Sequence, residues 1–343
     1  MGFALVCENY HIISMMSSKK QAPSMQKITL GLSMHRPEMI PIIADRMLQH
    51  KAIFLEEPPT VDFEQMLNGV LTVDDYLNLL DLEYPAFSRK LCYLLRELAA
   101  RGKKIIQVEP FLEILLGIHE FFAQGHRPQE LDRNAIHHRV YLAEHHATRT
   151  LLAYYQTVMT ESFEKTLEAI EQFARADATR FRLRDSLRAQ AMAPLFRQYR
   201  SAYIEAGVIH LLLWRLLRRQ ISPPHRLQLI YLADGALKRL KIKGHLYGPG
   251  DQLTLLYIFH PNHITTRRTK MLAARSIIYS KIIEKEELTD ALESYPHLRD
   301  ELACIRAAGQ LSLDDCRRLF PLVRNANSSA ARQIVTEYLA LRS

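Results

Sequence analysis

The chain alternates between short aliphatic runs and longer segments with helical spacing, and this alternation restricts its fold more than any other feature. Aliphatic runs at residues 26–33, 52–55 and 104–108 are separated by helical patterns, and two more runs follow at 202–204 and 227–232. Strands that alternate with helices favour a parallel sheet covered by helices. We therefore expect an α/β fold with a mostly parallel central sheet flanked by helices.

The remaining patterns divide the chain into three parts. Residues 1–24 are interpreted as a loose leader, or as an extension upstream of a start at Met25. Residues 25–250 would form the α/β core, and residues 251–343 show only helical patterns, so we expect a helical C-terminal region packed on that core.

Within these parts, finer patterns predict where helices begin and end. Thr179 is expected to cap a new helix, as threonine often does. In the C-terminal region, helices are predicted at 252–260, 265–285 and 286–294. Gly309 is expected to separate two further helices, the second capped by Ser312.

Composition excludes several classes of protein. The 343 residues include 45 Lys and Arg against 37 Asp and Glu, but the basic residues are scattered, which favours a solvated surface over a nucleic-acid interface. Four cysteines without a C-x-x-C pair are typical of reduced thiols. No apolar run approaches the roughly 18 to 20 residues of a membrane span, and the first residues lack the basic start of a signal peptide. We expect a cytoplasmic protein without a membrane span.

Two stretches of the chain, residues 27–47 and 201–219, have the same form: a strand, a glycine, a histidine and a helix. The histidines are His35 and His210. Ligands of open α/β sheets bind at the carboxyl ends of the strands, where these turns would lie. The two histidines are therefore the leading candidates for a site.

The glycines before them, Gly31 and Gly207, are expected to let the backbone turn sharply.

Carboxylates follow two other strands. Glu56 and Glu57 come after residues 52–55, and Glu109 follows residues 104–108. Two histidines and a carboxylate suit a catalytic metal with one open position. The alternative is that each strand-end side chain is a structural hydrogen-bonding group.

Arginines on a later helical segment supply a further candidate group. Arg184 and Arg188 lie four residues apart in a row that continues with apolar residues, and Asp185 follows Arg184. An arginine in such a row is expected to be half-buried and to need an anionic partner. That partner would be Glu56 or an oxyanion of a substrate.

Other clusters are interpreted as structural. The histidine pairs 137–138 and 145–146 are separated by about 10 Å along a helix, too far to share one ion. The basic residues at 215, 218 and 219 are assigned to the solvated side of a helix. The chain has no G-x-x-x-x-G-K-[ST], G-x-S-x-G or H-E-x-x-H motif.

Four of these features, in this order, resemble a known superfamily. It joins TraB and Tiki proteins with erythromycin-esterase-like and ChaN-like proteins. The matching motifs are the turn Gly31 to His35, Glu56 in IFLEEP, Arg184-Asp185 followed by Met192-Ala193, and Gly207 to His210 in GVIH. The first turn is one residue longer than the family's G-x-x-H. The resemblance spans residues 27–232.

The resemblance implies an α/β core with a hydrolytic site at these motifs. Tiki-like members are described as metal-dependent proteases, and erythromycin-esterase-like members as hydrolases that open a lactone with His and Glu. ChaN-like members are associated with haem, and many TraB-like proteins have no established activity.

We therefore expect a hydrolase of peptide or ester bonds. Its catalytic residues would be His35, Glu56, Arg184 and His210. A divalent metal such as Mn, Co or Zn would be held by His35, Glu56 and His210, or the same residues would activate water directly. Secondary candidates are Glu57, Glu109, Asp185 and Arg188. The alternatives are a non-catalytic protein that binds a ligand such as haem, a regulatory protein with the same fold, and a nucleic-acid-binding protein.

Overall fold

The computed structural model describes residues 26–199, 201–221, 223, 225–243, 246–261, 266–288 and 293–342, so the expected leader lies outside the described residues. Its centre is a five-stranded sheet with the strand order β3-β2-β4-β1-β5, in which every pairing is parallel. The strands are β1 (Gln26–Ser33), β2 (Ala52–Leu55), β3 (Lys104–Gln107), β4 (Ser201–Gly207) and β5 (His225–Tyr231). The predicted α/β fold is confirmed.

The strand order places the carboxyl ends of β2, β4 and β1 next to one another, although these strands are far apart in sequence. Ser33 at the end of β1 is opposite Gly207 at the end of β4. β4 also pairs with β2 on its other side. Side chains that follow these three strands can therefore meet at one edge of the sheet.

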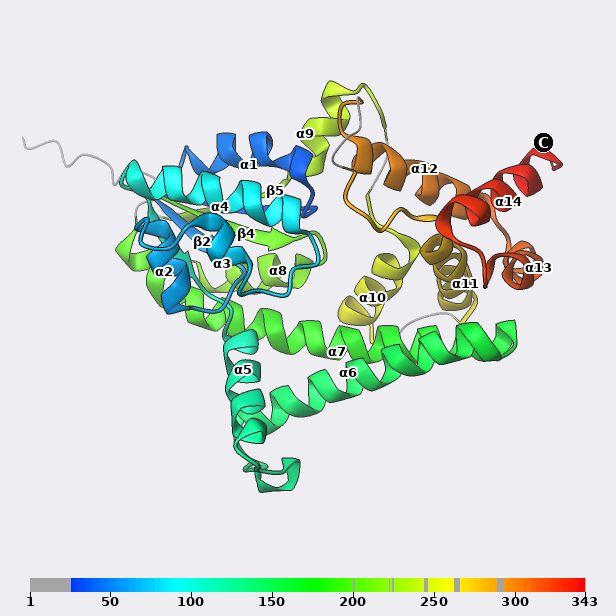
Figure 1. Cartoon of the computed structure of the whole chain (residues 1–343), viewed down its shortest axis with the longest axis horizontal. Helices are drawn as coiled ribbons and strands as arrows, with labels where there is room; N and C mark the ends of the chain where they lie inside the picture. Colours follow the sequence, from blue (N-terminus) through cyan, green and yellow to red (C-terminus); the bar gives the residue numbers. More distant parts are fainter. Residues whose placement is uncertain are drawn as a thin grey trace, which may run out of the picture.

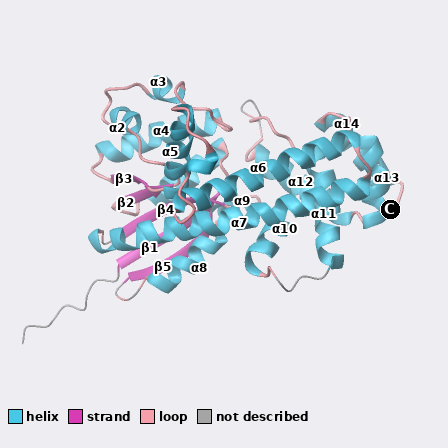
Figure 2. Ribbon diagram, turned by 90° about the horizontal axis from the view of Figure 1, so that it is seen from below, coloured by secondary structure: helices cyan, strands magenta, loops and turns pink. Residues whose placement is uncertain are grey.

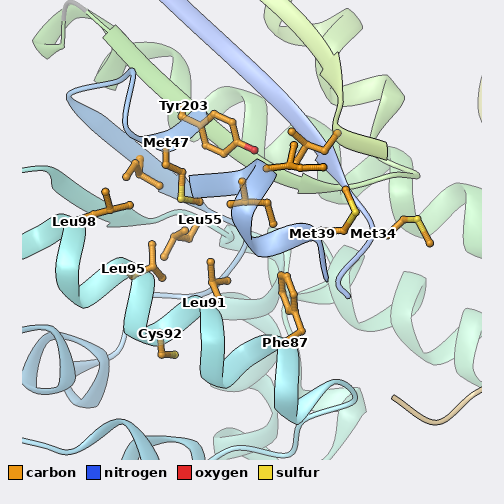
Figure 3. Close-up of a cluster of buried hydrophobic side chains, with 14 of the residues drawn as sticks. Met34, Met39, Met47, Leu55, Phe87, Leu91, Cys92, Leu95, Leu98 and Tyr203 are labelled. Carbon is orange, nitrogen blue, oxygen red and sulfur yellow. The ribbon is translucent and has the colours of Figure 1, made fainter. Parts of the chain in front are cut away.

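One face of the sheet is covered by helices that precede β3 and by a helix that follows β5. They are α1 (Ile40–Met47), α2 (Val61–Leu67), α3 (Val73–Leu77), α4 (Pro85–Ala100) and α9 (Leu232–Arg239). Figure 3 shows Leu91, Leu95 and Leu98 on one side of α4, facing the cluster that contains Leu55 and Tyr203. Their helical spacing gives α4 the apolar stripe that packs on the sheet.

The opposite face is covered by the last part of α7 (Phe163–Leu195) and by α8 (Leu211–Gln220). Met192, Leu213 and Leu217 from these helices pack on β-strand residues such as Leu30 and Ile204, and all five are fully buried. Short 3₁₀ turns lie at Pro37–Met39, Pro128–Glu130 and Phe196–Gln198.

Gly31 lies inside β1, and its role differs from the one expected. The prediction that Gly31 turns the backbone is wrong, whereas the chain does turn directly after Gly207, the last residue of β4, without a positive φ at either glycine. A Cβ at Gly31 would lie 2.1 Å from Oη of Tyr203 on the neighbouring strand. Position 31 therefore has to be a glycine, because the Tyr203 side chain occupies the space that any other side chain would need.

Gly31→Ala is expected to lower the free energy of unfolding by about 1–3 kcal/mol, because the new methyl group overpacks a filled core. Tyr203→Phe is the matched comparison. The buried hydroxyl of Tyr203 has no hydrogen-bond partner among the described residues, so its loss should be neutral or stabilising. Urea unfolding of both variants checks this. Equal stabilities for Gly31→Ala and the wild type would contradict it.

Three long helices connect β3 to β4: α5 (Pro110–Ala123), α6 (Ile136–Thr160) and α7. With 33 residues, α7 is about 50 Å long. Figures 1 and 2 show it running from beneath the sheet into the helical region, beside α6. One helix thus belongs to both halves of the molecule.

The prediction that Thr179 begins a helix is wrong, because Thr179 lies in the middle of α7. Its hydroxyl donates to the carbonyl of Arg175 one turn earlier. This is how threonine satisfies its hydroxyl inside a helix. The N-cap of α7 is Ser162, whose side chain accepts from the backbone of Lys165.

The C-terminal helices are α10 (Pro249–Phe259), α11 (Thr266–Ile282), α12 (Pro296–Gln310), α13 (Leu313–Val323) and α14 (Ser328–Ala340). Ser312 caps α13 as predicted. The two helices predicted on either side of Gly309 are observed, but Gly309 itself lies within α12, which ends one residue later at Gln310. In the predicted helix 286–294, the described residues are not helical.

The core of this helical region also contains side chains of α6 and of the first half of α7, including Tyr154, Ile170 and Ala174. The helical region is therefore built from two separate parts of the chain. Among the described residues, no helix is both long enough and apolar enough to cross a membrane.

Candidate functional site

A cavity of about 820 Å³ opens at the carboxyl edge of the sheet, between the sheet and the helical region. His35, Glu56, Arg184 and His210 all line it. These are the four residues that the sequence placed in a site. The structure brings them together in one cavity.

His210 is held by two carboxylates. It follows β4 in a turn closed by its own backbone N–H, which donates to the carbonyl of Gly207 at 3.1 Å. Its Nδ1 lies 2.5 Å from Oδ1 of Asp185, and its Nε2 lies 2.6 Å from Oε1 of Glu56. The His210 side chain is only 2% exposed. Its ring is therefore fixed in position from both sides.

Asp185 owes its position to α7. Phe181, Arg184, Asp185 and Arg188 are spaced three and four residues apart, so they form one stripe of the helix. The second oxygen of Asp185 accepts from the backbone N–H of Leu213 in the first turn of α8. One carboxylate thus caps α8 and orients His210.

The two carboxylates also set the charge of His210. Burial lowers its pKa, but Glu56 and Asp185 together outweigh burial and raise the pKa to about 9. The imidazole is therefore protonated at neutral pH. A metal ion would have to displace this proton to bind the ring.

Glu56 is the centre of the site. Its Oε1 lies 2.8 Å from Nη2 of Arg184, and its Oε2 accepts from the backbone N–H of Gly207 at 2.8 Å. Arg188 adds a third cation, 3.5 Å from Oε2. Burial alone would raise the pKa of Glu56, but His210 and Arg184 hold it well below its usual range. The prediction that Glu56 is the partner of Arg184 is confirmed.

Behind Glu56 lie a buried arginine and a buried carboxylate. Arg188 is completely buried, deeper than expected, and donates to the backbone carbonyls of Val108 and Glu205 at the ends of β3 and β4. Glu109 is also completely buried, with Oε2 3.2 Å from Nε of Arg184. Burial raises its pKa, although both arginines oppose this. Arg188 therefore links the ends of β3 and β4, and Glu109 lies against the guanidinium of Arg184.

His35 forms a second pair of histidine and carboxylate. Its Nε2 lies 2.8 Å from Oε1 of Glu205, and its ring stacks on Phe87 of α4 with 5.1 Å between ring centroids. The His35 side chain is 31% exposed, whereas that of Glu205 is 5% exposed. Burial lowers the pKa of His35, but Glu205 outweighs it and raises the pKa above its usual value. Unlike His210, His35 is open to the cavity.

Sequence reasoning missed Glu205. It is a charged residue inside an otherwise apolar strand, two positions before Gly207. A buried charge needs a partner, and that signal was available in the sequence. Its partner could not be identified, because His35 follows another strand and is 170 residues away.

One group of side chains in the described part of the chain could hold a metal ion. His35, Glu56 and Glu205 place their ligand atoms within 4.8 Å of one another. Glu205 takes the place that the sequence assigned to His210, whose two ring nitrogens are already hydrogen-bonded to carboxylates. Glu57 instead accepts from the side chain of Gln107, and burial raises its pKa.

No protein-family model matches the chain, and no solved structure matches it. An uncharacterised protein of Archaeoglobus fulgidus is 28% identical to it over 288 residues, which is 83% of this chain and 94% of the relative. The matched length exceeds that of the predicted α/β core, residues 25–250. The similarity to this archaeal protein therefore includes part of the helical region.

Proposed function

We propose that the chain is a hydrolase of peptide or ester bonds, with His35 as the base that activates water. The observation that carries the proposal is the paired and solvent-accessible His35. It faces a cavity that is also lined by Arg184 and His210. A base, its orienting carboxylate and fixed cations are the groups that acyl transfer to water requires.

In this proposal Glu205 orients His35 and stabilises its protonated form. Glu205 engages Nε2, so Nδ1 is the nitrogen that accepts a proton from water. Glu56 is less suited to be the base, because both its oxygens are hydrogen-bonded and its pKa is held low. Its role is to position cations.

Arg184 is the group proposed to stabilise the developing oxyanion. Its side chain is 20% exposed and lines the cavity, and Glu56 and Glu109 fix its guanidinium. A cation that is positioned before the reaction stabilises developing charge without reorganisation. The protonated His210 adds positive charge beside the same carboxylate.

A divalent metal is compatible with the donor atoms of His35, Glu56 and Glu205. When bound there, it would polarise the substrate carbonyl and lower the pKa of water. Three cations, Arg184, Arg188 and His210, surround Glu56 and weaken its attraction for a further cation. This charge distribution favours direct activation of water by His35.

The test is hydrolysis of a panel of p-nitrophenyl esters and short peptides by the purified chain. Exchange of His35 for glutamine should lower kcat/KM about a hundredfold, the lower end of general-base effects. Glu205→Gln should lower it less, because the amide can still accept from the ring but carries no charge. His145→Gln, at an exposed histidine of α6, is the matched control and should leave the rate unchanged.

Metal dependence is tested on the same panel. Unchanged rates with EDTA, and no gain with Mn²⁺ or Co²⁺, are expected for direct activation of water. Loss of activity with EDTA and recovery with Mn²⁺ would assign the three donors to a metal instead. Full activity in His35→Gln would remove His35 from the mechanism, and no turnover of any substrate would favour a non-catalytic ligand-binding protein.

A further inference from the structure

A second cavity, of about 450 Å³, lies between α6, α7 and α11. These helices meet in the helical region in Figure 1. Most of its lining side chains are apolar or aromatic, among them Tyr155, Val158 and Met159 of α6. Its volume and lining are those of a pocket for a small molecule.

This second cavity adjoins the cavity that contains His35. Ile170 and Phe173 of α7 and Tyr279 of α11 line both. A molecule bound across these shared residues would extend from the sheet edge into the helical region. The polar groups His35, Glu56 and Arg184 line the first cavity, and the lining of the second cavity is mostly apolar or aromatic.

We propose that the second cavity binds an apolar group of the substrate whose ester or amide bond is cleaved beside His35. This inference rests on the proposed function and narrows it: the substrate is a small amphiphilic ester or amide rather than a polar peptide. Burial of apolar groups stabilises binding in proportion to the area removed from water. A polar chain would gain nothing from these walls.

Two lysines of the second cavity indicate the charge that accompanies the apolar group. Lys281 and Lys285 both line it, and Lys285 also lines the first cavity. Burial and the nearby Lys285 lower the pKa of Lys281. The acidic group in both linings is Asp251, whose carboxylate also accepts from the backbone of Gly248 in the capping box of α10. The lining of the second cavity therefore contains two lysines and one carboxylate, and that carboxylate is already engaged in the capping box. This balance favours the binding of an amphiphile that carries an anionic group.

The kinetic test varies the acyl chain of p-nitrophenyl esters from acetate to octanoate. Each added methylene can raise kcat/KM by up to about fourfold, and we expect at least a tenfold rise over the series. Met159→Asp, at the mouth of the second cavity, should abolish most of this rise. Leu152→Asp is the matched control, because Leu152 is on the same helix and is 55% exposed against 58% for Met159.

The second test needs no turnover. 8-Anilinonaphthalene-1-sulfonate is titrated into the chain carrying His35→Gln, and decanoate or acetate is added as competitor. Decanoate should displace the dye, and acetate should not. Met159→Asp should weaken dye binding about tenfold, whereas Leu152→Asp should leave it unchanged.

The two tests separate the inference from the proposed function. Dye binding with displacement by decanoate, but no hydrolysis of any ester, would refute the hydrolase and leave the second cavity as a binding site. Hydrolysis with no dependence on chain length, and no displacement by decanoate, would overturn the inference and leave the hydrolase.

Discussion

Glu56→Ala is expected to lower the free energy of unfolding by about 3–5 kcal/mol, the cost of removing one partner from a buried ion pair. The carboxylate neutralises Arg184 and Arg188 and contacts His210, and its own side chain is 9% exposed. Without it, three cations would be left close together with too little compensating charge. The loss therefore exceeds that of a single hydrogen bond.

Urea unfolding at neutral pH measures this effect, and Glu97→Ala is the control. Glu97 is paired with Arg101 four residues later, and both side chains are 57% exposed. Removal of such a surface pair should cost less than about 1 kcal/mol. Similar losses in the two variants would show that Glu56 does not hold the site together.

The second large effect is a dependence of stability on pH that originates at His210. The folded-state pKa of about 9 lies above the unfolded value of 6.5, so the folded chain binds the proton more tightly. The resulting stabilisation is fully present below pH 6.5 and is lost as the pH rises through 9. The difference of about 2.5 pKa units corresponds to about 3 kcal/mol.

The free energy of unfolding of the wild type and of His210→Gln should be compared between pH 6 and 10. Burial also raises the pKa of Glu301 to about 8, which lowers stability over part of the same range in both proteins. The contribution of His210 is therefore the difference between the two curves, which should shrink by about 3 kcal/mol as the pH rises. A constant difference would mean that His210 is neutral in the folded chain.

Much of the fold could be predicted because strands and helices carry local signals. The aliphatic run at Ala52–Leu55 is followed by two prolines, and the observed β2 has these bounds. The course of α7 could not be predicted, because Thr179 has the same residue type as a helix cap. Whether its hydroxyl accepts at a helix start or donates to an earlier turn depends on the flanking backbone.

The candidate site could be predicted residue by residue but not pair by pair. His35 and His210 stand out because each follows a strand and a glycine. The pairing of His35 with Glu205, and of His210 with Asp185, depends on β4 lying beside β1 and on the reach of α7 under the sheet. Strand order is set by packing of the whole chain and leaves no local signal.

Because α7 is continuous through both halves of the molecule, it limits which fragments of the chain can fold alone. A chain ending at residue 250 would keep all five strands of the described sheet and all four predicted site residues. It would also expose Ile170, Ala174 and Ala178 of α7, whose side chains are buried in the core of the helical region. Such an exposed apolar surface promotes association. The smallest piece of this protein that folds alone is therefore expected to include the helices on both sides of the cavity.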